Sequence, residues 1–208
     1  MEKLDLKKTD RLFYSGKKGR WDRVVVPPMQ YLMIDGKGDP GGPDYAAALG
    51  ALYPLAYGVK FACKSEGSDF VVPPLSALWW SEDRAAFVEG NRDKWQWTAM
   101  IRMPDFVEPA LVEEARSATI TKQAKKGEDT SLLKVVRLDS LTEGDSFQTL
   151  HIGPYTDEAP VLAKLHDRVM PEAGVTFGSP HHEIYLSDPR RVAPEKLNTI
   201  LRQPVVKL

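Results

Sequence analysis

The chain has 208 residues, of which 42% are hydrophobic and 27% are charged, a balance typical of a globular protein with one large domain or two small ones. Its net charge of -1 excludes a global positive field that would attract nucleic acid or an anionic membrane surface. The single cysteine excludes an internal disulfide, and no signal peptide or apolar run of roughly 18 residues is visible. We therefore expect a soluble, cytoplasmic protein with no nucleic-acid and no membrane partner.

The first half of the chain predicts one strand, one helix and two further strands. Residues 1–22 are polar and are expected to be peripheral. A strand is predicted for Met29–Asp35, followed by a glycine-rich loop and a helix that Asp44 caps and Pro54 kinks or restarts. The stretches DFVVPPLSALWWSE and KWQWTAMIRMP then indicate two strands, joined by DRAAFVEGNRD as a hairpin connection.

The second half repeats this order after a connecting helix near residues 108–126. A strand over 147–153 ends in a Gly-Pro turn and is followed by a helix over 157–172. Two strands follow, over 181–187 and 199–206. Because the same element order occurs twice, we infer a diverged internal duplication of roughly 85 residues.

This repeat predicts an α+β fold of duplicated strand-helix-strand-strand (SHS2) modules with antiparallel sheets. Each module would carry its helix on one face of its sheet, and the helix-free faces would offer a concave surface. The expected divisions are a peripheral segment, a first module, a connecting helix with a linker strand, and a second module: 1–22, 23–105, 106–140 and 141–208.

A glycine pattern after the first strand matches the spacing of a dinucleotide-binding loop. It consists of Gly36, Gly38 and Gly41. Pro40 and Pro43 flank the third glycine, which in a true fingerprint packs inside the start of the helix. Asp35 and Asp39 would repel a pyrophosphate. The sequence therefore predicts a tight bend here and no nucleotide cofactor.

The histidines and the cysteine do not form a metal-binding pattern. His181 and His182 are adjacent, so they face opposite sides of a strand, and His151 and His166 lie on different elements. Cys63 has no activating partner in its neighbourhood and is interpreted as a buried structural thiol. The sequence predicts no metal and no cofactor.

Four of the five tryptophans cluster around the first predicted hairpin. They are Trp79, Trp80, Trp95 and Trp97. Trp95 and Trp97 share a strand face, and one indole of the preceding pair must share it with them. Two interpretations remain open, a core beneath the helix and an aromatic pocket for a flat or cationic molecule.

The strand in SPHHEIYLSDPRR carries a carboxylate at its centre. His181, Glu183 and Tyr185 share one face, while Ile184 and Leu186 on the other face have the character of core residues. Glu183 is either an exposed residue paired with a following arginine or a carboxylate inside a pocket. In a pocket, desolvation would raise its pKa.

Several of these stretches together resemble one known family. FQTLHIGPY, a helix and HHEIYLSDPRR in the second half, with YLMIDGKGDP, LSALWW and WQWTAMIRMPDFV in the first, are similar to the GyrI-like small-molecule-binding family. The likeness covers about residues 20–206 and favours the free-standing subfamily. It implies two modules with a central ligand cleft, the family glutamate at Glu183 and the tyrosine of the GPY motif at Tyr155.

The resemblance also implies what the protein does. Some free-standing relatives are similar to hydrolases that open the cyclopropane of DNA-alkylating antibiotics, which suggests an aromatic cleft for flat hydrophobic molecules and hydrolysis of a strained ring by activated water. Glu183 would activate the water, with Tyr155 or Tyr185 on the acceptor oxygen. The expected ligand-binding residues are Trp79, Trp80, Trp95, Trp97 and His151.

Two alternatives stay open at this point. The first alternative to hydrolysis is a non-catalytic binder that sequesters hydrophobic or cationic compounds, with Glu183 as counter-ion. The second is a gyrase-inhibitor-type interaction protein. Its expected state is a monomer or a weak homodimer.

Overall fold

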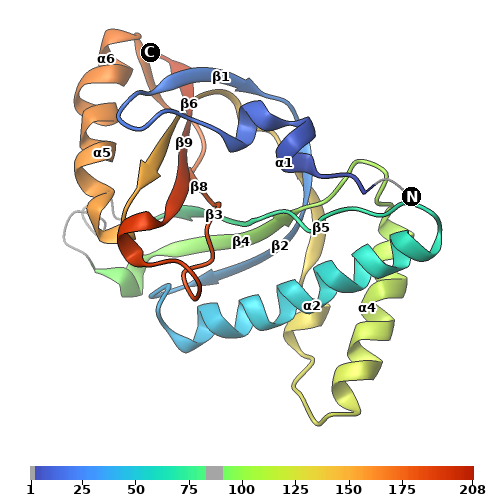
Figure 1. Ribbon diagram of the computed structural model, residues 1–208. Coiled ribbons are helices and arrows are strands. Elements are labelled where there is room, and N and C mark those ends of the chain that lie inside the picture. The colour runs from blue at the N-terminus through green and yellow to red at the C-terminus, as the bar shows by residue number, and fades with distance from the viewer. Residues whose placement is uncertain (1–2, 83–90) are drawn as a thin grey trace. The chain divides into compact units, whose positions relative to one another are not determined.

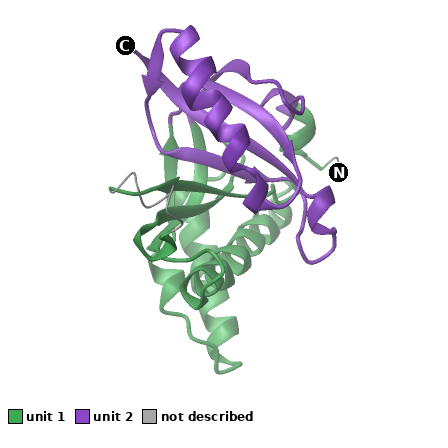
Figure 2. Ribbon diagram, turned by 90° about the vertical axis from the view of Figure 1, so that its left-hand side faces the viewer, with its two compact units in different colours: residues 1–9, 29–141 green, residues 10–28, 142–208 purple. Residues whose placement is uncertain are grey.

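The computed structural model describes residues 3–82 and 91–208 and has an α+β fold (Figure 1). Most of the predicted hairpin connection, residues 83–90, lies outside the described residues. The chain forms two compact units, distinguished by colour in Figure 2. Unit 1 contains residues 1–9 and 29–141, and unit 2 contains residues 10–28 and 142–208.

Unit 1 is built on an antiparallel sheet of four strands. They are β2 (Met29–Lys37), β3 (Leu75–Trp80), β4 (Gln96–Arg102) and β5 (Arg137–Leu141). β4 pairs with both β3 and β2, and β2 also pairs with β5. The short helix α1 (Leu6–Thr9) belongs to the same unit.

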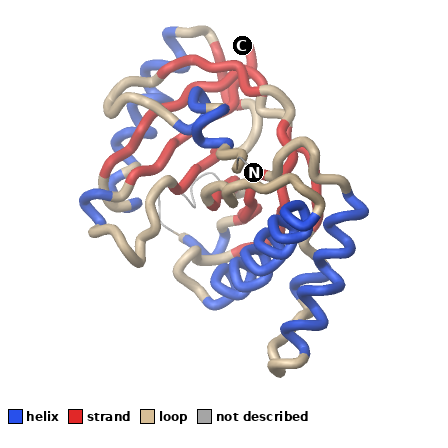
Figure 3. The backbone as a smooth tube through the Cα atoms, turned by 45° about the vertical axis from the view of Figure 1, so that its right-hand side comes forward, coloured by secondary structure: helices blue, strands red, loops and turns tan. Residues whose placement is uncertain are grey.

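Two long helices of unit 1 lie side by side, as Figure 3 shows. They are α2 (Pro43–Ser65), which also packs on β2 and β4, and α4 (Pro109–Ala124). α2 runs through Pro54 as one helix, and its N-cap is Gly42 with no side-chain cap bond, so the predicted Asp44 cap and the predicted restart at Pro54 were wrong. The alternative of a kink at Pro54 stays a prediction. Packing along the helix offsets the backbone hydrogen bond that the proline removes.

α2 has 23 residues and a mean hydropathy of 1.3, and is thus long and apolar enough for a membrane span. It is the one such helix within residues 3–82 and 91–208. In this fold α2 is a core helix, because Leu52, Leu55 and Val59 are fully buried. Cys63 is buried on the same helix, and burial raises the pKa of its thiol, as expected for a structural cysteine.

Unit 2 is built on five antiparallel strands. Its strands are β1 (Asp22–Val26), β6 (Gly144–Ile152), β7 (Val175–Phe177), β8 (His181–Tyr185) and β9 (Asn198–Lys207). β6 pairs with β1 and β9, and β9 also pairs with β8 and, near its carboxyl end, with β7.

A helical segment connects β6 to β7 in unit 2. It comprises a 3-10 turn (Tyr155–Asp157), α5 (Ala159–Lys164), a π-helical turn (Leu165–Val169) and α6 (Met170–Glu172). Leu165 and Met170 pack with Phe147 of β6 and Val205 of β9, and this cluster forms the core of the unit. The helical segment therefore covers the sheet face that carries Phe147 and Val205.

The two units share one connectivity. In unit 1 the chain runs β2, α2, β3, β4, and β4 lies between the other two strands. In unit 2 it runs β6, helical segment, β8, β9, and β9 lies between the other two. This agreement is consistent with the inferred duplication, which stays a prediction, as do the four expected domain boundaries.

Packing and backbone geometry account for the glycines in the bend after β2. Gly38 has a φ of 97°, and the Asp39 carboxylate accepts a hydrogen bond from the Gly41 amide. Gly36 is paired with Trp97 of β4, and a Cβ at Gly36 would lie 2.1 Å from the indole. The sequence therefore requires glycine at position 36 because of the tryptophan beside it.

Replacing Gly36 with alanine is expected to destabilise the protein by about 1–3 kcal/mol, since the buried indole of Trp97 must move. The matched control is Gly50→Ala in α2, where nothing lies within 4 Å of an added Cβ. That variant should gain about 0.5–1 kcal/mol. Urea unfolding of the two variants measures both effects, and equal stabilities would contradict the prediction.

Candidate functional site

The two faces of β8 have different surroundings, as the alternation of residues along the strand predicted. His182 and Ile184 are 0% and 3% exposed, whereas the side chain of Glu183 retains 15% exposure. Glu183 is opposite Leu201 of β9, which is opposite Thr149 of β6, so these three residues share a sheet face. This is the face that the helical segment of unit 2 covers. The helix-free face, which was predicted to offer a concave surface, is therefore not the face that carries Glu183.

Three residues of the predicted catalytic set lie together in unit 2. The Tyr185 hydroxyl donates a 2.8 Å hydrogen bond to Glu183 Oε2, and the Tyr155 ring packs edge-on against the Tyr185 ring at 5.6 Å between centroids. Arg190 and Arg191, the possible surface partners of Glu183, form ion pairs with Asp188. Glu183 is therefore a shielded carboxylate oriented by a tyrosine.

A second glutamate, which the sequence reading missed, contacts Glu183. Glu158 lies at the start of α5, is 5% exposed, and shares a side-chain hydrogen bond with Glu183. Its Oε1 has no hydrogen-bond partner. Burial and the neighbouring Glu183 carboxylate raise the pKa of Glu158 strongly. Burial also raises the pKa of Glu183, against the opposing effect of hydrogen bonds from Tyr185 and Glu158. A protonated carboxyl in the pair is therefore favoured, because two buried carboxylates repel each other.

The other titratable groups beside the pair are neutral. Burial lowers the pKa of His181, whose Nε2 lies 3.7 Å from Glu183 Oε1, to about 3. Burial and the negative charges of Glu158, Glu183 and Asp188 raise the pKa of Tyr155 to about 12. At neutral pH Tyr155 is thus a hydrogen-bond donor, and His181 offers no positive charge to stabilise the carboxylates.

His151, predicted to bind ligand, supports the turn that precedes Tyr155. It is 5% exposed on β6, and its Nε2 lies 3.1 Å from the Pro154 carbonyl oxygen. The imidazole thereby helps to set the direction in which the chain enters the 3-10 turn of Tyr155. Direct ligand contact by His151 stays a prediction.

The predicted indole cluster forms within unit 1. Trp79 and Trp97 are cross-strand partners, and the Trp79 and Trp95 rings are 6.0 Å apart. Tyr45 of α2 packs against Trp97 and Trp79 at 4.9 and 5.7 Å, and these indoles are 1% and 6% exposed. The core interpretation therefore accounts for Trp97 and Trp79. Trp95 and Trp80, the latter on the opposite face of β3, are only partly buried.

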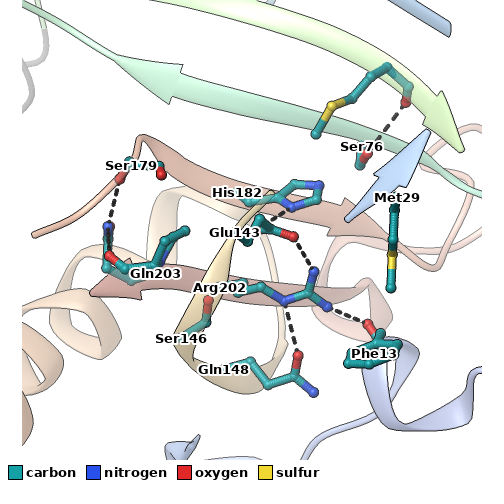
Figure 4. A network of polar contacts seen from close by, with 12 residues as sticks. Phe13, Met29, Ser76, Glu143, Ser146, Gln148, Ser179, His182, Arg202 and Gln203 are labelled. Carbon is teal, nitrogen blue, oxygen red and sulfur yellow. Dashed lines mark hydrogen bonds and ion pairs between the residues drawn. The ribbon is translucent and has the colours of Figure 1, made fainter. Parts of the chain in front are cut away.

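Behind β8, a buried ionic network occupies the other face of the unit 2 sheet (Figure 4). Glu143 lies 2.9 Å from His182 Nδ1 and accepts a 2.7 Å hydrogen bond from the Arg202 guanidinium. Arg202 also donates to the Gln148 side chain and to the Phe13 carbonyl oxygen. The N-terminal segment, predicted to be peripheral, therefore contributes to this network. The network fixes β8 against its neighbours and so supports Glu183 from behind.

Two glutamates of unit 2, Glu143 and Glu158, were not predicted, and they differ in how far the sequence indicates their positions. Glu143 follows from a charge argument, because the Arg202 guanidinium projects from a buried strand position and requires an acidic partner. Glu158 stands in TDEAP, which has the composition of an exposed helix start, and nothing local indicates its burial.

The α+β fold and the shielded carboxylate beside tyrosines are features of a small-molecule-binding protein. The chain belongs to the GyrI-like family, since the model of the GyrI-like small molecule binding domain matches residues 24–206. The expected family membership is thereby confirmed. No curated protein matches the chain.

Solved structures agree with this assignment. The chain is similar to an uncharacterized conserved protein from Listeria innocua, with 42% identity and a TM-score of 0.88 over 98% of this chain and 100% of that chain. It is also similar to a hydrolase from the same organism, with 41% identity and a TM-score of 0.86 over 99% and 100% of the two chains. The EcmrR C-terminal domain, at 12% identity, a TM-score of 0.55 and coverage of 91% and 98%, shares the fold alone.

Proposed function

We propose that this protein binds flat, hydrophobic small molecules and hydrolyses a strained ring in them, such as the cyclopropane of a DNA-alkylating compound. The observation that carries the proposal is the Glu183 carboxylate, which is shielded, oriented by Tyr185 and raised in pKa by burial. A carboxylate with a raised pKa is a stronger base than an exposed one, and it can accept a proton from water near neutral pH.

The tyrosines would take separate roles in this reaction. Tyr185 donates a hydrogen bond to Glu183 and so orients the base. Tyr155 stays protonated because its pKa is raised to about 12, and it is 40% exposed. We assign it to the acceptor oxygen on which negative charge develops as the ring opens.

Ring strain lowers the barrier, so one positioned base, worth about 10²–10⁴-fold, is sufficient without a covalent intermediate. Two Listeria innocua proteins that are 39% and 41% identical to this chain are described as hydrolases, which supports a catalytic rather than a purely binding role. Trp80 and Trp95, which are partly buried in unit 1, stay predicted ligand-binding residues because an indole stacks well on a planar ring. Detoxification in the cytoplasm is the corresponding biological role.

The decisive experiment is a count of product per protein. The protein is incubated with a large excess of a cyclopropane-containing alkylator, and the ring-opened product is quantified by mass spectrometry against a protein-free control. We expect product well beyond one equivalent per chain. Product that stops at one equivalent for every strained compound tried would instead indicate a sequestering protein.

A further inference from the structure

Glu158 has no function in the proposed reaction as described above, yet its surroundings are unusual for a glutamate. It is almost completely buried, it hydrogen-bonds another carboxyl, and its Oε1 has no partner. A buried carboxyl oxygen without a partner is costly, and such groups persist where they serve a function. The sequence around it offers no structural reason for burial.

We propose that Glu158 is the general acid of the ring-opening reaction and forms, with Glu183, a carboxyl pair that resets its own protonation after each turnover. This inference rests on the proposed hydrolysis. It adds a further catalytic residue to that site. It also specifies the substrates as those in which the electrons of the broken bond move to a conjugated carbonyl oxygen.

The reaction then balances without a co-reactant. Water attacks the ring carbon and forms a C–O bond, while Glu183 takes the proton of the breaking O–H bond. The strained C–C bond breaks, its electron pair moves to the conjugated oxygen, and Glu158 donates its proton there. One proton remains on the pair, now on Glu183, and it returns to Glu158 through the hydrogen bond between the carboxyls.

The neighbouring groups of unit 2 favour this division of roles. The Tyr185 hydroxyl donates to Glu183, which stabilises the ionised form of Glu183 rather than of Glu158. His181 is neutral, and Tyr155 faces the carboxylates as a protonated donor, so neither competes as acid or base at neutral pH. Asp188 acts on Tyr155 through its charge and is itself held by Arg190. The proton of the pair therefore resides mainly on Glu158.

Glu158→Gln tests the proposal, because it keeps the size of the side chain and removes the transferable proton. For the wild type we expect a bell-shaped dependence of kcat on pH, rising as the pair loses its first proton and falling as Glu158 loses the second. The variant should lose about 10²-fold in kcat and also the alkaline limb of the bell. Alkylators whose ring-opened phenol is more acidic should be affected less, because they need less protonation.

Glu172→Gln is the matched control, since Glu172 is 64% exposed and pairs with Arg168 on the helix surface. It should leave rate and pH profile unchanged. Wild-type rate and an intact alkaline limb in Glu158→Gln would overturn the proposal.

Infrared spectroscopy separates this inference from the proposed function. A protonated carboxyl band at neutral pH should be present in the wild type and in Glu172→Gln, and absent in Glu158→Gln. A missing band in the wild type would overturn the role of Glu158 even if the enzyme turns over. A band without turnover would locate the proton on Glu158, refute the hydrolysis and, with it, the acid role.

Discussion

Glu183→Gln is expected to reduce the rate of ring opening by about 10²–10⁴-fold while leaving the binding of neutral planar ligands nearly unchanged. The amide fills the same volume and can still hydrogen-bond to Tyr185, but it cannot accept a proton from water. The loss should therefore appear in kcat rather than in the dissociation constant. Rates come from mass spectrometry of the product, and binding comes from quenching of tryptophan fluorescence.

The fold of this variant is checked by thermal unfolding. The raised pKa of Glu183 means that its ionised form is unfavourable in the folded state. The protonated side chain of Glu183 contributes stability below its ordinary pKa, and this contribution is lost as the pH rises through the raised pKa. The amide of Glu183→Gln is never ionised, so this variant should cost no stability at neutral pH. If cationic ligands bind less tightly and turnover persists, Glu183 is a counter-ion and another group activates water.

Glu143→Gln is expected to destabilise the protein by about 3–5 kcal/mol, because it leaves the buried Arg202 guanidinium without its carboxylate. Both side chains are at most 2% exposed, so water cannot replace the lost interaction. The exposed pair of Glu172 and Arg168 supplies the control, where Glu172→Gln should cost no more than about 1 kcal/mol. Urea unfolding at neutral pH measures both, and equal losses would contradict the prediction.

The same variant should change how stability depends on pH. Burial alone would raise the pKa of Glu143, but the interactions with His182 and Arg202 outweigh it and lower the pKa from 4.5 to about 2. A depressed carboxyl pKa contributes stability above its ordinary value, and this contribution is lost as the pH falls toward 2. The stability difference between wild type and Glu143→Gln should therefore shrink between these two pH values.

The sequence predicted most of the strands because alternation and apolar runs reflect local backbone geometry. The central feature of β8, with Glu183 on one face and Ile184 on the other, follows from period two alone. The strand β1 was missed because Pro27 and Pro28 interrupt the apolar run directly after it, and a strand was predicted only from Met29 onward. α2 does not restart at Pro54, as one of the two predictions had it, because tertiary packing offsets the penalty of the proline.

The candidate site was less predictable because its second carboxyl depends on contacts distant in sequence. Glu158 and Glu183 are separated by a helical segment and a strand, and no periodicity connects them. The tryptophans illustrate the opposite problem, since their number suggested a binding pocket, whereas Trp97 is fully engaged with Tyr45 and Gly36 in the core of unit 1. Composition identifies unusual side chains, and only the fold decides which of them face a ligand.

The alternation of β8 also bears on how this protein can evolve. His182 and Glu183 are consecutive. His182 contacts Glu143 in the buried ionic network, and Glu183 lies in the candidate site. A shift of one residue along the strand would exchange them, placing a carboxylate beside Glu143 and an imidazole beside Glu158. Insertions and deletions within β8 are therefore expected to remove stability and the proposed activity together.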